Sequence, residues 1–278
     1  MSSDWIPYSP VATERATAAR LLVRRGVRSP QLGNQRDLLV CLPSSYDREP
    51  DRAWPVLYMH DGQNLFDRGT SYADEWRADE ALRTAAETGL EVIVVGISNT
   101  GDTRIDEYSP FHDARAGGGR GQDYVAFLTD TVKPEIDAAF RTLRDPASTG
   151  VAGSSMGGLI SLYAYFERND VFGFAGAMSP ALWFARRAFF SWLKRRAQTR
   201  GRIYLDAGTK EGAFVLADVA RLRDTLLDRG YRLGRDLRVV LEAGARHDER
   251  AWGRRFLGLL EFMLDGERSA SPARHRAG

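Results

Sequence analysis

The sequence contains a single cysteine and only four histidines among its 278 residues. One cysteine, Cys41, excludes a disulfide bond within the chain and is typical of proteins from a reducing compartment. No segment has the roughly 18 consecutive apolar residues of a membrane-spanning helix, and the first residues lack the basic and apolar regions of a signal peptide. The sequence therefore predicts a cytoplasmic protein that does not enter a membrane.

Excess charge of either sign is also lacking. The 39 basic and 37 acidic residues give a net charge of +2 and are interspersed along the chain. A nucleic-acid-binding protein gathers positive charge on one surface, so this pattern predicts no nucleic-acid partner. The histidines stand far from one another, none at ligand spacing to another, which predicts no metal site.

Short hydrophobic segments alternate with helix-like segments along the chain. The expected strands cover residues 21–23, 37–42, 55–59, 90–97, 149–152, 172–178, 202–207 and 237–241. The expected helices cover residues 76–87, 123–139, a segment after Ser155, 186–197, 214–229 and 250–264. This alternation requires parallel strands and right-handed crossovers, which predicts an α/β fold with a doubly wound, mostly parallel sheet.

The ends of the chain are expected to differ from this pattern. The first two strands are separated by turn residues, so we expect an antiparallel N-terminal edge. Residues 1–15 are expected to be irregular. The polar, Arg-rich segment 266–278 is expected to be a disordered tail, which leaves residues 1–265 as a single domain.

The segment 148–160 contains a Gly-x-Ser-x-Gly match with Gly153, Ser155 and Gly157 at its fixed positions. With 27 glycines in the chain such a match often arises by chance, so its flanks matter. A short strand-like run precedes it, and apolar residues follow at helical spacing. Strand, sharp turn and helix form the setting of a nucleophile elbow, and Ser155 is therefore the candidate nucleophile.

A serine nucleophile needs a base, and in α/β hydrolases the histidine follows the serine in the chain. His60 and His112 precede Ser155, and His275 lies in the polar tail. His247 remains, directly after the last expected strand, where parallel strands present their carboxyl ends. Elimination and position therefore predict His247 as the base.

An acyl-transfer site also needs two backbone N–H groups that bind the oxyanion. One is expected from Met156, the residue after the nucleophile. The second is expected from the segment His60-Asp61-Gly62-Gln63 that follows the third strand. Gly62 permits a close backbone approach, so the N–H of Gln63 is the candidate, with a plain Asp-Gly turn as the alternative.

Two acidic residues, Asp206 and Glu211, qualify as the third member of a triad. Asp206 lies within an expected strand, whereas Glu211 lies in the loop beyond it. Glu211 is also explained as a carboxylate near the start of a helix, and Asp206 as an acceptor for loop N–H groups. The residues alone leave both acids open.

Six segments together resemble the putative-esterase family, which contains enterochelin-esterase-like hydrolases, feruloyl esterases and esterase D. They are PVLYMHDGQNLFD, GISNTGDTRIDEYSP, AGSSMGGLISLYA, AMSPALWF, YLDAGTKE and GARHDERAW. The resemblance runs from about Gln35 to Leu264, with the segments in the same order.

The resemblance implies a serine hydrolase of the α/β-hydrolase fold that needs no cofactor. It implies Ser155 as nucleophile, His247 as base and Glu211, in place of Asp206, as the acid. Gln63 and Met156 are implied as the oxyanion donors.

Substrate contacts are expected at the carboxyl edge of the sheet. Asn99, Arg104 and Tyr108 lie in the loop 98–122 after one strand, and Trp183 lies in an aromatic loop after another. Each of these residues is equally well explained by packing.

The leading hypothesis is a serine esterase that hydrolyses a small-molecule or glycan-linked ester through an acyl-enzyme. An acyltransferase or thioesterase with the same residues is the alternative, and a catalytically silent binding protein is another. The complete set of serine, histidine and acid argues against a silent protein. The sequence identifies neither the acyl group nor the oligomeric state.

Overall fold

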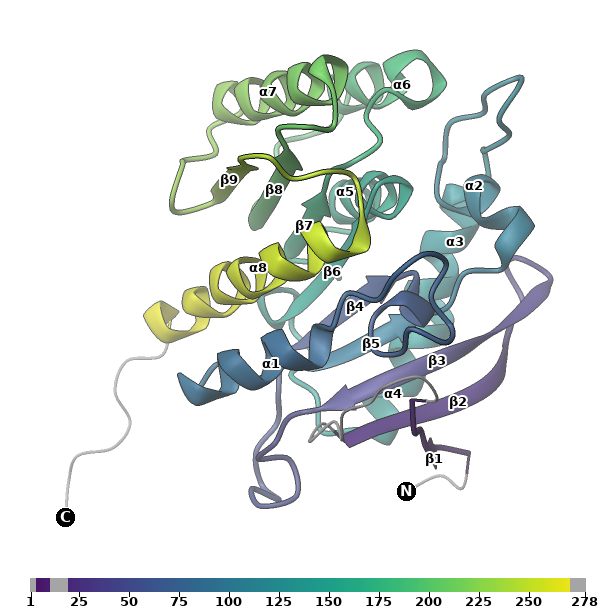
Figure 1. The fold of residues 1–278 in the computed structure, drawn as a ribbon, viewed down its shortest axis with the longest axis vertical. Helices are drawn as coiled ribbons and strands as arrows, with labels where there is room; N and C mark the ends of the chain where they lie inside the picture. Colours follow the sequence, from purple (N-terminus) through teal and green to yellow (C-terminus); the bar gives the residue numbers. More distant parts are fainter. Residues whose placement is uncertain (1–3, 11–19, 271–278) are drawn as a thin grey trace.

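The computed structural model describes residues 4–10 and 20–270 and contains one nine-stranded sheet covered by helices on both faces (Figure 1). Along the sheet the strands follow the order β1-β2-β3-β5-β4-β6-β7-β8-β9. Their bounds are Ile6–Pro7 (β1), Arg20–Ser29 (β2), Asn34–Leu42 (β3), Val56–His60 (β4), Ile93–Ile97 (β5), Thr149–Ser154 (β6), Phe174–Met178 (β7), Arg202–Gly208 (β8) and Leu237–Glu242 (β9).

The sheet is antiparallel at its N-terminal edge and parallel elsewhere. Strands β1, β2, β3 and β5 pair antiparallel, whereas every pair from β5 to β9 is parallel. The predicted α/β class, the parallel sheet and its antiparallel edge are therefore confirmed. Strand β1 is an addition, because it lies in the N-terminal segment that was expected to be irregular.

Eight α-helices connect or flank these strands in the described part of the chain. Their bounds are Ala78–Glu87 (α1), Arg104–Glu107 (α2), Gly121–Phe127 (α3), Lys133–Ala139 (α4), Met156–Glu167 (α5), Phe184–Leu193 (α6), Ala213–Asp228 (α7) and Glu249–Ala270 (α8). Four short helical turns are Gly62–Asn64 (η1), Gly101–Thr103 (η2), Leu128–Val132 (η3) and Pro146–Ser148 (η4).

Several helices depart from the expected pattern. The π-helical turn η3 divides the helix expected over 123–139 into α3 and α4. Helix α6 begins at Phe184, and its next three residues, Ala185 to Arg187, have left-handed backbone angles. Helix α8 continues to Ala270, beyond the expected end at residue 264 and into the segment predicted as a tail. Residues 271–278 of that predicted tail lie outside the described residues.

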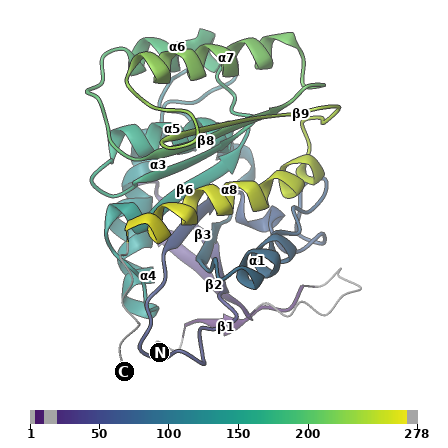
Figure 2. The ribbon, with the colours of Figure 1, turned by 90° about the vertical axis from the view of Figure 1, so that its left-hand side faces the viewer.

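Two hydrophobic cores lie on opposite faces of the sheet. Helices α1 and α8 lie side by side and cover one face, while helices α3 to α7 supply the core of the other (Figures 1 and 2). The central strands β4, β5, β6 and β7 have every residue buried. Parallel strands covered on both faces require this continuous burial.

The loop 98–122 is anchored to the sheet by a buried ion pair. It contains η2 and α2, and Glu107 of α2 accepts hydrogen bonds from the guanidinium of Arg36 on β3. Both side chains have no exposed surface. Breaking such a pair leaves a buried charge without its partner, so it holds this long segment in one position.

None of the helices over residues 4–10 and 20–270 combines the length and the apolar composition that crossing a membrane requires.

His60 ends β4 as a buried, uncharged histidine. Its Nδ1 lies 2.8 Å from the hydroxyl of Tyr124 on α3, and the residue is 1% exposed. Burial lowers the pKa of His60 from 6.5 to about 3, because the charged imidazolium loses its hydration. The folded protein therefore keeps this ring neutral under conditions in which the unfolded chain protonates it.

This difference predicts a loss of stability in acid. Between about pH 6.5 and pH 3 the unfolded state binds a proton at His60 that the folded state does not bind. The free energy of unfolding should fall as the pH falls through this window, by at most about 1.4 kcal/mol per pH unit. Urea titrations of the wild type and of His60→Asn, which retains a polar group toward Tyr124, should show the steeper fall in the wild type.

Asp206 acts in the opposite direction over part of the same window. Burial raises its pKa from 3.8 to about 6, so the folded state binds the extra proton there. Both proteins in the comparison retain Asp206, and the difference between them isolates His60. Equal slopes for the two proteins would show that His60 does not carry this acid sensitivity.

Candidate active site

Ser155 occupies a strained turn between strand β6 and helix α5. Its φ of 57° and ψ of −120° lie in a region that side chains rarely adopt. Its N–H continues the ladder to β7 by donating to the carbonyl of Met178 at 3.0 Å. A Cβ at Gly153 would lie 2.9 Å from the backbone carbon of Gly157, and a Cβ at Gly157 would lie 3.3 Å from Cβ of His60. The two motif glycines therefore permit the sharp turn and its close contact with β4.

His247 lies in the loop after β9 and forms a hydrogen bond with Glu211. The Nδ1 atom of His247 is 2.8 Å from Oε2 of Glu211, which lies in the loop after β8. The Glu211 side chain is fully buried, whereas that of His247 is 40% exposed. Trp252 of α8 packs its ring against the imidazole at 4.9 Å and nearly at right angles. The imidazole thus has one nitrogen bound to a buried carboxylate.

The second oxygen of Glu211 accepts two further hydrogen bonds. They come from the hydroxyl of Ser179 at 2.6 Å and from the N–H of Gly208 at 2.7 Å. Burial alone would raise the pKa of Glu211, but the hydrogen bonds outweigh it and hold the pKa below its usual value. An ionised carboxylate only accepts, so Nδ1 of His247 carries the hydrogen, and in the neutral ring this tautomer places the lone pair on Nε2.

Asp206, the other acidic candidate, faces a different set of groups. One oxygen accepts the backbone N–H of Ser179 at 3.0 Å, and the other accepts Nε of Arg255 at 2.9 Å. Asp206 and the Arg255 side chain are almost fully buried. These contacts match the explanation of Asp206 as an acceptor for loop N–H groups.

Gln63 and Met156 lie at the starts of two neighbouring helical segments. Met156 is the first residue of α5, and Gln63 is in the first turn of η1. The first N–H groups of a helix have no partner within it, so the N–H groups of Met156 and Gln63 are not used by their own segments. Strands β4 and β6, which precede the two segments, are paired in parallel, so both starts lie at the same sheet edge.

Asp61 connects three of the four predicted substrate residues. Its carboxylate accepts two hydrogen bonds from Arg104 and one from Asn99, each 2.7 Å long. Its N–H donates to the hydroxyl of Tyr108 at 3.1 Å. The polar groups of these three residues therefore hold Asp61, which itself has a left-handed φ of 56°. Trp183, the fourth, is 51% exposed.

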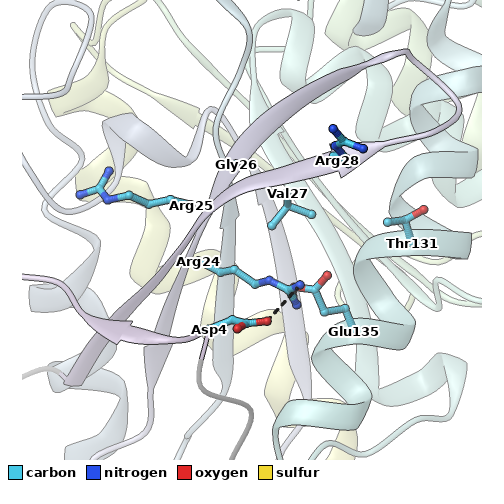
Figure 3. Close-up of a pocket in the computed structure, with 8 residues that line it drawn as sticks. All are labelled: Asp4, Arg24, Arg25, Gly26, Val27, Arg28, Thr131 and Glu135. Atoms are coloured by element: carbon cyan, nitrogen blue, oxygen red, sulfur yellow. Dashed lines mark ion pairs between the residues drawn. The ribbon is translucent and has the colours of Figure 1, made fainter.

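A polar hollow of about 530 Å³ lies at the antiparallel edge of the sheet, away from the predicted site residues (Figure 3). Arg24 crosses it to form ion pairs with Asp4 and Glu135. The hollow is lined by Asp4, Arg24, Arg25, Gly26, Val27, Arg28, Thr131 and Glu135. None of the predicted site residues belongs to it, so it is separate from the candidate active site.

Metal-ligating side chains do not gather in the part of the chain that the structure describes. No three histidine, cysteine, aspartate or glutamate residues there come together as a metal site would require. Cys41 is a free, buried thiol, and burial raises its pKa to about 12.

The sequence did not reveal four residues that support the site: Asp61, Ser179, Trp252 and Arg255. Ser179 directly follows β7 at the carboxyl edge, and this position was the one available signal. Trp252 and Arg255 lie on α8, and only the folded chain brings them to Ser179. Their importance depends on contacts between residues more than 70 positions apart in the chain.

Curated relatives include proteins of bacteria and fungi. Over 258 residues the chain is 25% identical to the uncharacterised protein YbbA of Bacillus subtilis, covering 88% of this chain and 99% of the relative. It is 31% identical over 135 residues to the siderophore triacetylfusarinine C esterase of Aspergillus fumigatus. That second match covers 46% of this chain and 44% of the fungal enzyme.

Solved structures share the fold at low sequence identity. The siderophore hydrolase EstA of Aspergillus nidulans has a TM-score of 0.70 and 18% identity, over 93% of this chain and 98% of its own. The enterobactin esterase FES of Shigella flexneri has a TM-score of 0.68 and 19% identity, over 94% of this chain and 62% of its own.

A family model also matches most of the chain. The model described as "Putative esterase" matches residues 29–263. This range contains the strained serine, the histidine–glutamate hydrogen bond and the sheet edge where they lie. The chain belongs to the Putative esterase family and is a carboxylic-ester hydrolase.

Proposed function

We propose that the protein is a serine esterase that works through an acyl-enzyme, with Ser155, His247 and Glu211 as its triad. The observation that carries the proposal is the 2.8 Å hydrogen bond from Nδ1 of His247 to the buried carboxylate of Glu211. The strained turn at Ser155 is a second, independent argument for the proposal, because such a turn presents a serine hydroxyl at the sheet edge.

In the first half of the reaction, Oγ of Ser155 attacks the ester carbonyl carbon while Nε2 of His247 takes its proton. The tetrahedral intermediate then breaks its bond to the alkoxide, and the imidazolium returns that proton to the leaving alcohol. Water repeats the sequence on the acyl-enzyme and releases the acid. Glu211 stabilises the imidazolium in both halves and keeps the Nδ1–H tautomer.

The negative charge on the carbonyl oxygen is bound by the N–H groups of Met156 and Gln63 in this proposal. Both belong to the first turn of a helical segment at the same sheet edge, which supports the assignment. Fixed dipoles aimed at the developing charge provide much of the acceleration in acyl transfer.

We propose a small-molecule ester as the substrate. The curated relative from Aspergillus fumigatus is a siderophore triacetylfusarinine C esterase, and EstA is a siderophore hydrolase, which makes siderophore esters the first to test. Trp183 is exposed enough to contact such a molecule, whereas Asn99, Arg104 and Tyr108 act through Asp61. A hydrolysis screen with acetyl, feruloyl and siderophore esters, and one thioester, distinguishes these classes.

A fluorophosphonate probe should label Ser155. Ser155→Ala should abolish both labelling and hydrolysis of p-nitrophenyl acetate, while the thermal unfolding midpoint changes little because alanine keeps the backbone strain. Ser154→Ala is the matched control, since Ser154 lies in β6 beside the elbow and should leave labelling intact. Labelling that survives Ser155→Ala and disappears in Ser154→Ala would overturn the proposal.

The acid is tested by Glu211→Gln and Asp206→Asn side by side. Glu211→Gln removes the charge that stabilises the imidazolium and should lower kcat by a factor on the order of 10⁴. Asp206→Asn should mainly lower stability, because it removes the carboxylate bonded to Nε of the buried Arg255, which then keeps only its ion pairs with Glu242 and Glu211.

Circular dichroism confirms folding at the assay temperature, and urea titration gives the stability of each variant. If Asp206→Asn is folded and inactive while Glu211→Gln is active, the acid is Asp206.

The oxyanion assignment separates the backbone of Gln63 from its side chain. Gly62→Val should cost activity on the scale of a lost donor, about 10²–10³ in kcat. The reason is steric, because a Cβ at Gly62 would lie 2.4 Å from the backbone carbon of Gly96 and would displace the loop. Gln63→Ala keeps the N–H and should cost far less, losing only the acceptor for the N–H of Asn99. Equally small effects in both variants would place the second donor elsewhere.

A further inference from the structure

Ser179 lies at the point where the nucleophile, the acid and helix α8 meet. It follows β7, is 1% exposed, and has a left-handed φ of 45°. Two residues later, the N–H of Ala181 donates to the carbonyl of Ser155 at 2.9 Å. Its own hydroxyl lies 2.6 Å from Oε1 of Glu211. The loop that carries Ser179 is therefore bonded to both the elbow and the acid.

Three polar groups surround the Ser179 hydroxyl. Nε1 of Trp252 lies at 3.0 Å and Nη2 of Arg255 at 3.1 Å, in addition to the carboxylate of Glu211. An indole N–H and a guanidinium can only donate, and they fill the two acceptor positions of the hydroxyl. Its single hydrogen must then point to Glu211.

The direction of these bonds strengthens the contact with Glu211. A hydroxyl that already accepts two hydrogen bonds, one from a cation, becomes a better donor. The distance of 2.6 Å lies within the 2.5–2.7 Å typical of a hydroxyl bound to an ionised carboxylate. Asp206 holds the backbone of Ser179 and the guanidinium of Arg255 in place, because it accepts hydrogen bonds from the N–H of Ser179 and from Nε of Arg255.

We propose that the Ser179 hydroxyl is a positioning residue that orients the carboxylate of Glu211 toward His247 and keeps it ionised during catalysis. The inference rests on the proposed function, since it assigns Ser179 a role through the proposed acid. It also explains why Trp252 touches both residues: its indole N–H binds Ser179 and its ring packs against His247.

The proposal is tested with Ser179→Ala and Ser179→Gly, assayed with p-nitrophenyl acetate. Both variants remove the hydroxyl, and glycine also suits the left-handed backbone. A lost hydrogen bond to a charged group should lower kcat by about 10- to 100-fold. KM should change little, because Glu211 acts on the transition state and not on the bound ester.

Ser161→Ala is the matched control. Its buried hydroxyl donates to the carbonyl of Gly157 at 2.7 Å, in the helix that follows the nucleophile, and it does not touch Glu211. This variant should retain the wild-type kcat. A fall in kcat as large as that of the Ser179 variants would show that losing any buried hydroxyl here is enough, and would overturn the proposal.

A double variant distinguishes positioning from general support of the structure. If Ser179 acts through Glu211, removing its hydroxyl in a Glu211→Gln background should add little further loss, less than about threefold. A further loss as large as that in the wild-type background would overturn the proposal, because Ser179 would then act independently of the acid.

Trp252→Phe provides a route that leaves Ser179 and its backbone unchanged. It removes one donor to the hydroxyl and keeps an aromatic ring against His247, so kcat should fall by a smaller factor than in Ser179→Ala. If the Ser179 variants fold and their kcat is unchanged, the inference is overturned. If they misfold, an unchanged kcat in Trp252→Phe overturns it. If Ser155→Ala is inactive in the same assay, the proposed function still stands; if Ser155→Ala is active, the function itself fails.

Discussion

The buried carboxylate of Glu211 is the group on which the arrangement of the site depends. It accepts three hydrogen bonds. The donors are Ser179 directly after β7, Gly208 at the end of β8 and His247 in the loop after β9. Taking a carboxylate out of water is costly unless donors replace its hydration. The donors that replace this hydration also fix the orientation of the Glu211 carboxylate. The same hydrogen bonds therefore stabilise its charge and determine its geometry.

Asp61 is a second carboxylate that is held by several donors, in the turn after β4 beside the elbow. A left-handed aspartate directly after β4 is unfavourable by itself, and Arg104 and Asn99 hold it through its carboxylate. The ion pair between Arg36 and Glu107 fixes the segment that supplies these two residues. The loop 98–122, expected to supply substrate contacts, thus supports the turn that presents Gln63.

The parts of the fold that follow local rules could be predicted. Continuous apolar runs marked the central strands, and glycines marked the elbow, because a side chain at Gly153 or Gly157 would crowd the turn and its contact with β4. The position of His247 at the carboxyl edge of the sheet followed from its place after the last strand. The roles of Ser179 and Asp61 could not be predicted, since they depend on donors from distant segments. Strand β1 and the end of α8 were missed. A strand of two residues is too short to show an alternating pattern, and the last turns of α8 are polar and lack apolar residues at helical spacing.

The position of each strand in the sheet also separates the site into parts of unequal stability. Ser155 follows β6, which lies inside the sheet with every residue buried, whereas His247 follows β9, an edge strand with partly exposed residues. Edge strands open by local fluctuations that need less free energy than unfolding of the whole domain. The imidazole should therefore leave its place more often than the serine does, and a protein that still holds its core would then have lost the residue proposed as its base.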